Sequence, residues 1–328
     1  MNGNGMNGVR PAALQWQMGL MNHQGKYLTA ETFGFKLNAS ATVLKKKQLW
    51  TLEQDPSDEQ TVYLRSHLGR YLSGSKKGDV TCESEEKGAD EKFSIEYSTD
   101  GSGRWAIRSL TFAYYLGGSA DNLRCYEKQP GATEWWTVHL AIHPQVNIRS
   151  IARKAYAHLK EDQVRFSELI PWGEDALINL EFTEGKYAVR SFDGRYVQND
   201  GELVNAPGPD SLYTLEIWSG QNAGFALKDS TGKYLTTTGK DGMLQARKTV
   251  HKVSKDDIFT LEDSQLQGFL TALHNGKKVS IKQGSGRDGQ PGRGDGHGDL
   301  PGRAGQDDTR TVSYPHLSEH TVGPRRRL

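Results

Sequence analysis

The stretch Gly25-Lys26-Tyr27-Leu28-Thr29 is a tight glycine turn that leads into an alternating strand. The same pattern, in close or loose form, recurs along the chain, and its tyrosines are Tyr27, Tyr71, Tyr115, Tyr156, Tyr196 and Tyr234. These tyrosines are 44, 44, 41, 40 and 38 residues apart. A nearly fixed period of this size indicates one supersecondary unit that must pack on copies of itself to bury its apolar face.

A second marker follows the same period. Each unit ends in an aromatic or aliphatic residue, a small polar residue, an aliphatic residue and usually a glutamate. The copies are Trp50-Thr51-Leu52-Glu53, Phe93-Ser94-Ile95-Glu96, Trp136-Thr137-Val138-His139, Ile178-Asn179-Leu180-Glu181, Tyr213-Thr214-Leu215-Glu216 and Phe259-Thr260-Leu261-Glu262. Three four-stranded units that close around a pseudo-threefold axis form a β-trefoil, and closure removes free sheet edges. The six units therefore predict an all-β chain with two tandem β-trefoil domains.

The repeat also predicts the domain boundaries. Residues 1–13 are expected to form a disordered leader, 14–143 the first β-trefoil, 144–266 the second, and 267–284 the first strands of a truncated third β-trefoil. The remaining residues, 285–328, contain nine Gly, four Pro and seven Arg but no Lys, Ile, Phe or Trp. Such a segment buries too little apolar area to offset its ordering entropy, so we predict that it is disordered.

The change of composition after Gly284 also predicts that this tail is read out of frame. With permitted codons, dropping one base at Ser285 opens a hidden frame that contains Phe-Gln-Val-Glu, the strand ending of the other units. Its glutamate falls 41 codons after Glu262, within the period of the repeat.

Composition restricts the partners and the compartment. The formal net charge is +1, so any basic binding site must be local. The two cysteines, Cys82 and Cys125, do not form a disulfide framework in a chain of 328 residues. The sequence has no secretion signal and no apolar run of the roughly 20 residues that span a bilayer. We therefore predict a cytoplasmic protein without membrane insertion, and we interpret Arg325-Arg326-Arg327 as a solvated basic end rather than a nucleic-acid site.

Catalytic and cofactor motifs are weak or lacking. Gly3-x-Gly5-x-x-Gly8 matches the dinucleotide fingerprint, but no strand precedes it and no helix follows it. The sequence contains no Gly-x-Ser-x-Gly, His-Glu-x-x-His or Cys-x-x-Cys motif, and its histidines do not have metal-ligand spacing. We therefore predict a protein that is not an enzyme and uses no cofactor or metal.

Several stretches resemble the first domain of fascin, namely Lys26 to Lys36, Leu44 to Glu53, Leu64 to Leu72 and His143 to Asn147. Fascins are cytosolic proteins of four tandem β-trefoils that cross-link actin filaments into tight parallel bundles. The resemblance runs from about residue 14 to residue 284. It implies that the chain carries two of the four trefoils and the opening of the third, that it is a monomer, and that its partner is F-actin.

The resemblance also implies where a filament binds. Actin filaments are acidic, so the binding surface needs clustered cations. Lys26 and the run Lys45-Lys46-Lys47 map onto the actin-binding surface of the first fascin domain. From the residues alone, this run is typical of a solvated loop. A second cationic stretch resembles a further filament-contacting region and contains Arg247, Lys248, Lys252 and Lys255.

One departure concerns regulation. Fascins can be switched off by phosphorylation of a serine directly before the Leu-Lys-Lys-Lys run, and this chain has Val43 there. Ser40 and Thr42 are nearby hydroxyls, and we predict them as regulatory phosphorylation sites. A charge of about −2 beside three lysines would neutralise much of the local field.

A carbohydrate-binding, lectin-like module is the main alternative. Trefoil lectins repeat a Gln-x-Trp motif once per unit, whereas this chain matches it once, at Gln48-Leu49-Trp50. We interpret this single match as part of a hydrophobic core.

Overall fold

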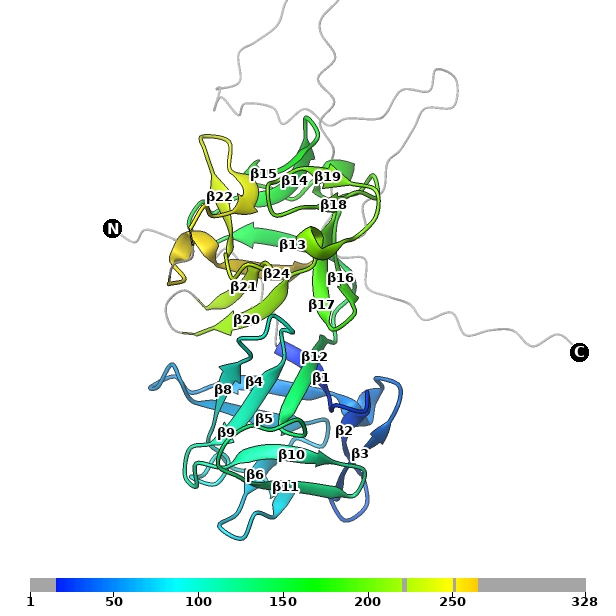
Figure 1. Cartoon of the computed structure of the whole chain (residues 1–328), viewed down its shortest axis with the longest axis vertical. Coiled ribbons are helices and arrows are strands. Elements are labelled where there is room, and N and C mark those ends of the chain that lie inside the picture. The colour runs from blue at the N-terminus through cyan, green and yellow to red at the C-terminus, as the bar shows by residue number, and fades with distance from the viewer. Residues whose placement is uncertain (1–15, 220–222, 250–251, 265–328) are drawn as a thin grey trace, which may run out of the picture. The chain divides into compact units, whose positions relative to one another are not determined.

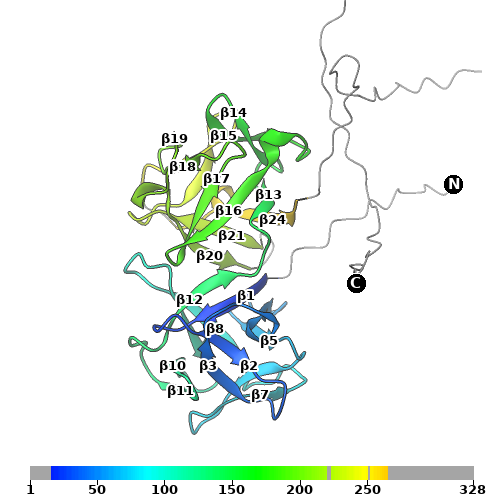
Figure 2. The same cartoon turned by 90° about the vertical axis from the view of Figure 1, so that its right-hand side faces the viewer.

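The computed structural model describes residues 16–219, 223–249 and 252–264, which form two twelve-stranded sheets (Figures 1 and 2). The chain divides into a compact unit, Met1–Ser264, and a second unit, Gln265–Leu328, which lies outside the described residues. In the described part, the only helices are four single-turn 3-10 helices, η1 (Lys46–Gln48), η2 (Glu174–Ala176), η3 (Pro209–Ser211) and η5 (Lys255–Asp257).

The first sheet closes on itself. Its strands are β1 (Trp16–Met21), β2 (Tyr27–Ala30), β3 (Leu37–Ala41), β4 (Trp50–Gln54), β5 (Val62–Ser66), β6 (Tyr71–Gly74), β7 (Val80–Ser84), β8 (Phe93–Tyr97), β9 (Trp105–Ser109), β10 (Tyr115–Ser119), β11 (Asn122–Glu127) and β12 (Trp135–Leu140). Strands β1, β4, β5, β8, β9 and β12 pair in a ring, and β12 returns to β1. The hairpins β2–β3, β6–β7 and β10–β11 complete the three units.

The second sheet repeats this plan. Its strands are β13 (Gln145–Ser150), β14 (Tyr156–Lys160), β15 (Gln163–Glu168), β16 (Ile178–Thr183), β17 (Lys186–Arg190), β18 (Tyr196–Val197), β19 (Leu203–Val204), β20 (Thr214–Trp218), β21 (Gly224–Lys228), β22 (Leu235–Thr238), β23 (Met243–Ala246) and β24 (Phe259–Asp263). The ring runs through β13, β16, β17, β20, β21 and β24, with an isolated bridge between Tyr187 and Tyr213 joining β17 to β20. We call the two closed sheets trefoil 1 and trefoil 2.

The strand endings that mark each repeat form the two cores. Their first residues are at most 1% exposed, and they are Trp50, Phe93, Trp136, Ile178, Tyr213 and Phe259. The indoles of Trp50 and Trp136 each donate to a backbone carbonyl of their own unit, at 3.0 and 2.9 Å. Trp50 is fully buried, so the single Gln-x-Trp match belongs to the core as predicted.

The structure confirms the all-β architecture with tandem trefoils, and Cys82 and Cys125 are buried free thiols. The domain boundaries at residues 143/144 and 266 stay predictions. The predicted leader, the start of a third trefoil and the out-of-frame tail lie outside the described residues. No helix within the described ranges is long and apolar enough to cross a membrane.

Candidate functional site

A tight turn positions Lys26 at the start of β2. The side chain of buried Asn22 accepts hydrogen bonds from the backbone N–H groups of Gln24 and Lys26, both at 3.0 Å. Gly25 has φ +70°, which a residue with a side chain rarely adopts. The Asn22 side chain and the Gly25 conformation therefore fix the backbone of this turn. The Lys26 side chain is half-buried at the end of the turn.

The run Lys45-Lys46-Lys47 is held against β2 by Gln48. The Gln48 side chain is buried, accepts from the Lys45 backbone N–H at 3.1 Å and donates to Thr29 Oγ1 at 3.0 Å. All three lysines are exposed. Helix η1 packs on β2, so the structure brings the lysine run to the strand that follows Lys26. We call Lys26, Lys45, Lys46 and Lys47 the lysine surface.

The three lysines differ in their pairing. Lys47 Nζ lies 2.7 Å from Glu31 Oε2, and this hydrogen bond, with another from Asn38, lowers the pKa of the Glu31 carboxyl. Among the described residues, the ammonium groups of Lys45 and Lys46 form no ion pair. Two of the three charges therefore remain available to an acidic partner.

Residues that the sequence did not single out complete this surface. Burial, together with the charges of Lys46 and Lys47, lowers the pKa of His67, which places this imidazole beside the lysines. The Arg70 guanidinium lies 4.3 Å from the centroid of the Phe35 ring, and it also pairs with Glu85 at 2.6 Å. His67 and Arg70 lie on the turn between β5 and β6, and only the folded sheet brings His67 near Lys46 and Lys47 and Arg70 onto Phe35.

The two predicted phosphorylation sites have different surroundings. Ser40 is exposed and its hydroxyl donates to Asn38 Oδ1 at 2.7 Å. The Asn38 amide in turn donates to Glu31, the partner of Lys47. Thr42 is exposed in the segment that leads to Lys45. A phosphoryl group on Ser40 would remove the hydroxyl proton that begins this network.

The residues of the second cationic stretch have different surroundings in the structure. Arg247 Nε donates to the fully buried carboxylate of Asp257 at 2.9 Å, so Arg247 supports the fold. Exposed Lys248 lines a polar groove of about 530 Å³ with the threonines of β22. Lys252 lines a different groove, of about 580 Å³, and Lys255 is exposed on η5. Arg247 and Lys248 line the same groove, and the role of these four residues in filament binding stays a prediction.

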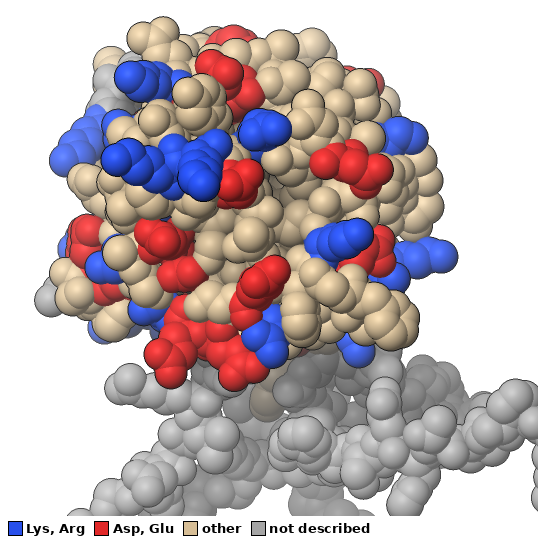
Figure 3. Space-filling model, turned by 90° about the horizontal axis from the view of Figure 1, so that it is seen from below, with Lys and Arg blue, Asp and Glu red and all other residues tan. Residues whose placement is uncertain are grey.

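Charge on the outer surface is mixed. Figure 3 shows basic and acidic side chains on one face of the molecule, with a basic group and an acidic group lying apart. No group of three or more His, Cys, Asp and Glu side chains in the described ranges could hold a metal ion. The exposed ammonium groups of Lys45 and Lys46 could form ionic contacts with an acidic partner.

Comparison with known proteins identifies the family. The Fascin domain family matches residues 24–138 and 146–261, which is more than half of the chain. The chain belongs to the fascin family. Fascin-2 of Bos taurus is 44% identical over 274 residues, which is 83% of this chain and 54% of that protein. Fascin of Strongylocentrotus purpuratus is 38% identical over 282 residues, with the same coverage of 83% and 54%.

This fascin chain spans about half the length of the curated relatives it matches. Among solved structures, the designed 3-fold symmetric protein ThreeFoil is 18% identical, with a TM-score of 0.33 over 38% of this chain and 97% of that chain. SeviL bound to asialo-GM1 saccharide is 15% identical, with a TM-score of 0.35 over 39% of this chain and 99% of that chain. Neither of these two likenesses bears on function.

Proposed function

We propose that this chain binds actin filaments through the lysine surface and that it represents the filament-binding half of a fascin that cross-links filaments into parallel bundles. The observation that carries the proposal is that two of the three neighbouring lysines form no ion pair within the described residues. Lys45 and Lys46 are exposed and unpaired within the described part of the chain, on a loop that Gln48 fastens to β2. A fixed cluster of cations suits an acidic filament because little side-chain and loop order is lost on binding.

Binding of this kind depends on salt. Exposed charges are screened over about 10 Å at 0.1 M salt, so the affinity of an ionic surface falls as salt is added. The same exposure means that Lys45 and Lys46 contribute little to the stability of the fold. Filament binding and folding stability are therefore separable by mutation at this surface.

Bundling requires one molecule to hold two filaments. Trefoil 1 carries the lysine surface, whereas in trefoil 2 Arg247 is paired with the buried carboxylate of Asp257. We therefore propose that the 328-residue chain binds filaments weakly as a monomer, does not bundle them, and acts in the cytoplasm at the actin cytoskeleton without enzymatic activity. The lectin-like alternative loses its basis, because Gln48 and Trp50 are both buried.

Co-sedimentation with actin tests this proposal. Replacing Lys45 and Lys46 by Glu should lower the fraction that pellets at high speed by several-fold, with an unchanged melting temperature. Lys76→Glu with Lys77→Glu is the matched control, since it reverses two exposed lysines on the β6–β7 turn of the same trefoil. Equal losses of binding in the two variants, or no loss in the first variant, would contradict the role of the lysine surface in filament binding. Bundles that pellet at low speed would contradict the single-site proposal.

A further inference from the structure

A polar pattern recurs in the repeats. In five of the six units, the marker tyrosine donates its hydroxyl proton to the glutamate that ends a strand. These pairs are Tyr71–Glu53 at 3.1 Å, Tyr115–Glu96 at 2.6 Å, Tyr156–Glu262 at 2.8 Å, Tyr196–Glu181 at 3.0 Å and Tyr234–Glu216 at 2.7 Å. In each unit a basic residue pairs with that tyrosine in the β-ladder, namely Arg65, Arg108, Arg149, Arg190 and Lys228.

The remaining unit, which is the first along the chain, lacks both charged residues. Tyr27 Oη lies 2.8 Å from Nδ1 of His139, which occupies the place of the glutamate. Met21 pairs with Tyr27 in the ladder and occupies the place of the basic residue. The acid and the base are thus lost together, and the hydrogen bond to the tyrosine is kept.

This uncharged site is where trefoil 2 packs on trefoil 1. The His139 ring stacks on Phe182 of β16, with ring centroids 4.3 Å apart and an interplanar angle of 11°. Tyr187 of β17 donates to the Val138 carbonyl at 2.8 Å and accepts from the Leu140 N–H at 2.9 Å. Trefoil 2 therefore holds the backbone of β12 on both sides of His139.

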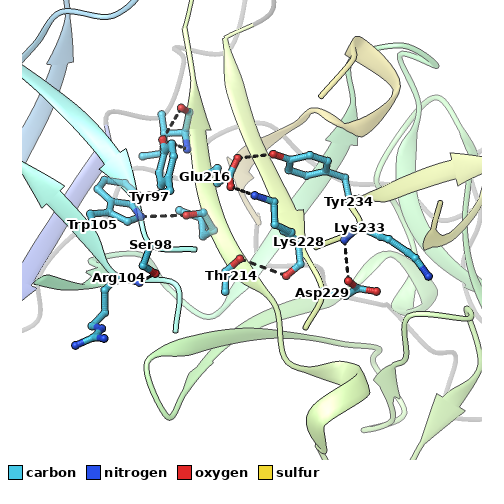
Figure 4. Close-up of polar contacts among 12 residues, drawn as sticks. Tyr97, Ser98, Arg104, Trp105, Thr214, Glu216, Lys228, Asp229, Lys233 and Tyr234 are labelled. Carbon is cyan, nitrogen blue, oxygen red and sulfur yellow. Dashed lines mark hydrogen bonds and ion pairs between the residues drawn. The ribbon is translucent and has the colours of Figure 1, made fainter. Parts of the chain in front are cut away.

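A second tyrosine makes the reciprocal contact (Figure 4). Tyr97 of trefoil 1 donates to the Ile217 carbonyl of β20 and accepts from the Ile217 N–H, both at 2.9 Å. Trp105 donates its indole N–H to the Leu215 carbonyl at 3.1 Å. Each trefoil thus supplies one tyrosine that hydrogen-bonds a strand of the other, namely buried Tyr187 and half-buried Tyr97.

The groups that face His139 offer no counter-charge for a proton. They are Tyr27 from β2, the stacked Phe182 ring from β16, Tyr187 from β17, which bonds the backbone on both sides of His139, and Gly19 opposite it on β1. The turn between β16 and β17 carries Glu184 and Lys186, and its Gly185 lies against Thr137, two residues before His139. Burial lowers the pKa of His139, and no carboxylate among the described residues raises it.

We propose that Tyr27, His139 and Phe182 form a proton-sensitive joint that holds the two trefoils together. In its neutral form with the proton on Nε2, His139 accepts from Tyr27 through Nδ1 and stacks on Phe182. Protonation places a charge without a counter-charge in this half-buried, stacked site, so acid weakens docking. Because docking lowers the pKa of His139, the joint is most stable at neutral pH and weakens as the pH falls below the ordinary histidine pKa of about 6.5. Each unit of that lowering changes the docking equilibrium by about tenfold.

The joint also reaches the lysine surface. A Cβ on Gly19 would lie 2.5 Å from Leu44 Cδ1 and 2.8 Å from the Tyr27 ring, so only a glycine lets these two side chains approach. Leu44 directly precedes the lysine run, and Tyr27 follows Lys26. His139 is thus a positioning residue for this surface, a consequence that rests on the proposed filament binding.

Amide hydrogen exchange on the 328-residue chain without actin tests the joint. The Leu140 and Ile217 amides donate to tyrosines of the opposite trefoil, whereas the amides of β5 and β16 have ladder partners in their own trefoil and serve as references. Between pH 7.5 and pH 5.5, protection of Leu140 and Ile217 should fall relative to the references, by up to about tenfold, after correction for intrinsic rates. His139→Gln keeps an acceptor for Tyr27 but cannot titrate, so its protection should not change. Equal protection at both pH values in the unmodified chain, or an equal loss in His139→Gln, overturns the proposal.

A second variant restores the charged pattern of the other units. Met21→Arg with His139→Glu should leave trefoil 1 folded, with reference amides protected, and should expose Leu140 and Ile217 at both pH values. Retained protection of those two amides overturns the proposal.

Co-sedimentation with actin filaments is a separate experiment that tests whether the joint affects the lysine surface. Acid should weaken co-sedimentation more in the unmodified chain than in His139→Gln, whereas protonation of His67, beside Lys46 and Lys47, acts in the opposite direction in both. Equal acid effects in the two proteins overturn the coupling. If Lys45→Glu with Lys46→Glu binds filaments normally, the proposed function fails, while the exchange result still decides the joint.

Discussion

The ion pair between Arg247 and Asp257 allows a sharp test of whether Arg247 belongs to the fold or to a filament site. Asp257 is fully buried, and its carboxylate accepts from Arg247 Nε at 2.9 Å, from the Ser254 N–H at 2.8 Å and from Ser254 Oγ at 3.0 Å. Arg247→Met keeps the apolar stem of the side chain and removes its charge. The buried Asp257 carboxylate then loses its contact with this guanidinium.

The cost of this change follows from the geometry. Removing one partner of a buried pair costs about 3–5 kcal/mol. The Arg247 side chain is 33% exposed and Asp257 keeps its two hydrogen bonds to Ser254, so we expect a loss at or just below that range, about 2–3 kcal/mol. Filament binding at the lysine surface should be unchanged, because those residues lie on trefoil 1.

A double-mutant cycle in urea measures this value. Asp257→Asn should also destabilise the chain, and Arg247→Met with Asp257→Asn should cost about 1 kcal/mol less than the sum of the single changes, because the two residues interact directly and each single change already removes their ion pair. Lys248→Met is the matched control, since Lys248 is an exposed neighbour. A loss below about 0.5 kcal/mol in Arg247→Met, together with weaker filament binding, would refute the structural role of Arg247.

Three further predictions concern the core, the regulation and the tail. Trp50→Ala removes a fully buried indole and its hydrogen bond to Leu28, so chemical denaturation should show a loss of about 3–5 kcal/mol; a loss below about 1 kcal/mol would contradict the repeat alignment. Thr42→Glu introduces a negative charge three residues before Lys45 and should weaken co-sedimentation, whereas normal binding would exclude Thr42 as a switch. Sequencing the transcript across codons 280–305 should reveal a one-base difference that opens the Phe-Gln-Val-Glu frame, and a transcript that confirms the printed frame refutes it.

The trefoils were predictable because both sequence markers have a structural cause within the repeat. The tyrosine of one unit bonds the strand-ending glutamate of a neighbouring unit, as Tyr71 does with Glu53, so the two markers recur together. The aromatic residue of the second marker fills the core, as Trp136 does. Periodic spacing therefore carries information about both hydrogen bonding and packing, and the order of strands follows from ring closure.

The details of the candidate site were not predictable in this way. The run of three lysines is visible as composition, but its pairing is not, because Glu31 lies 16 positions before Lys47 and meets it only when β2 and η1 pack. The role of His139 is similar. Its departure from glutamate is visible in the repeat, but the reason for that departure is the Phe182 ring of the other trefoil.

The two 3-10 helices before β4 and β24 show how one residue separates a binding loop from a structural one. Gln48 ends η1 and Asp257 ends η5, and both side chains are buried and accept the backbone N–H three residues earlier. Gln48 makes that contact without a charge, so no lysine is required to neutralise it. Asp257 makes it with a carboxylate, which must be paired when buried, and Arg247 is used for this purpose. The same loop thus leaves exposed lysines without ion pairs in trefoil 1 and neutralises its own charge in trefoil 2, which is why we expect one filament contact rather than two.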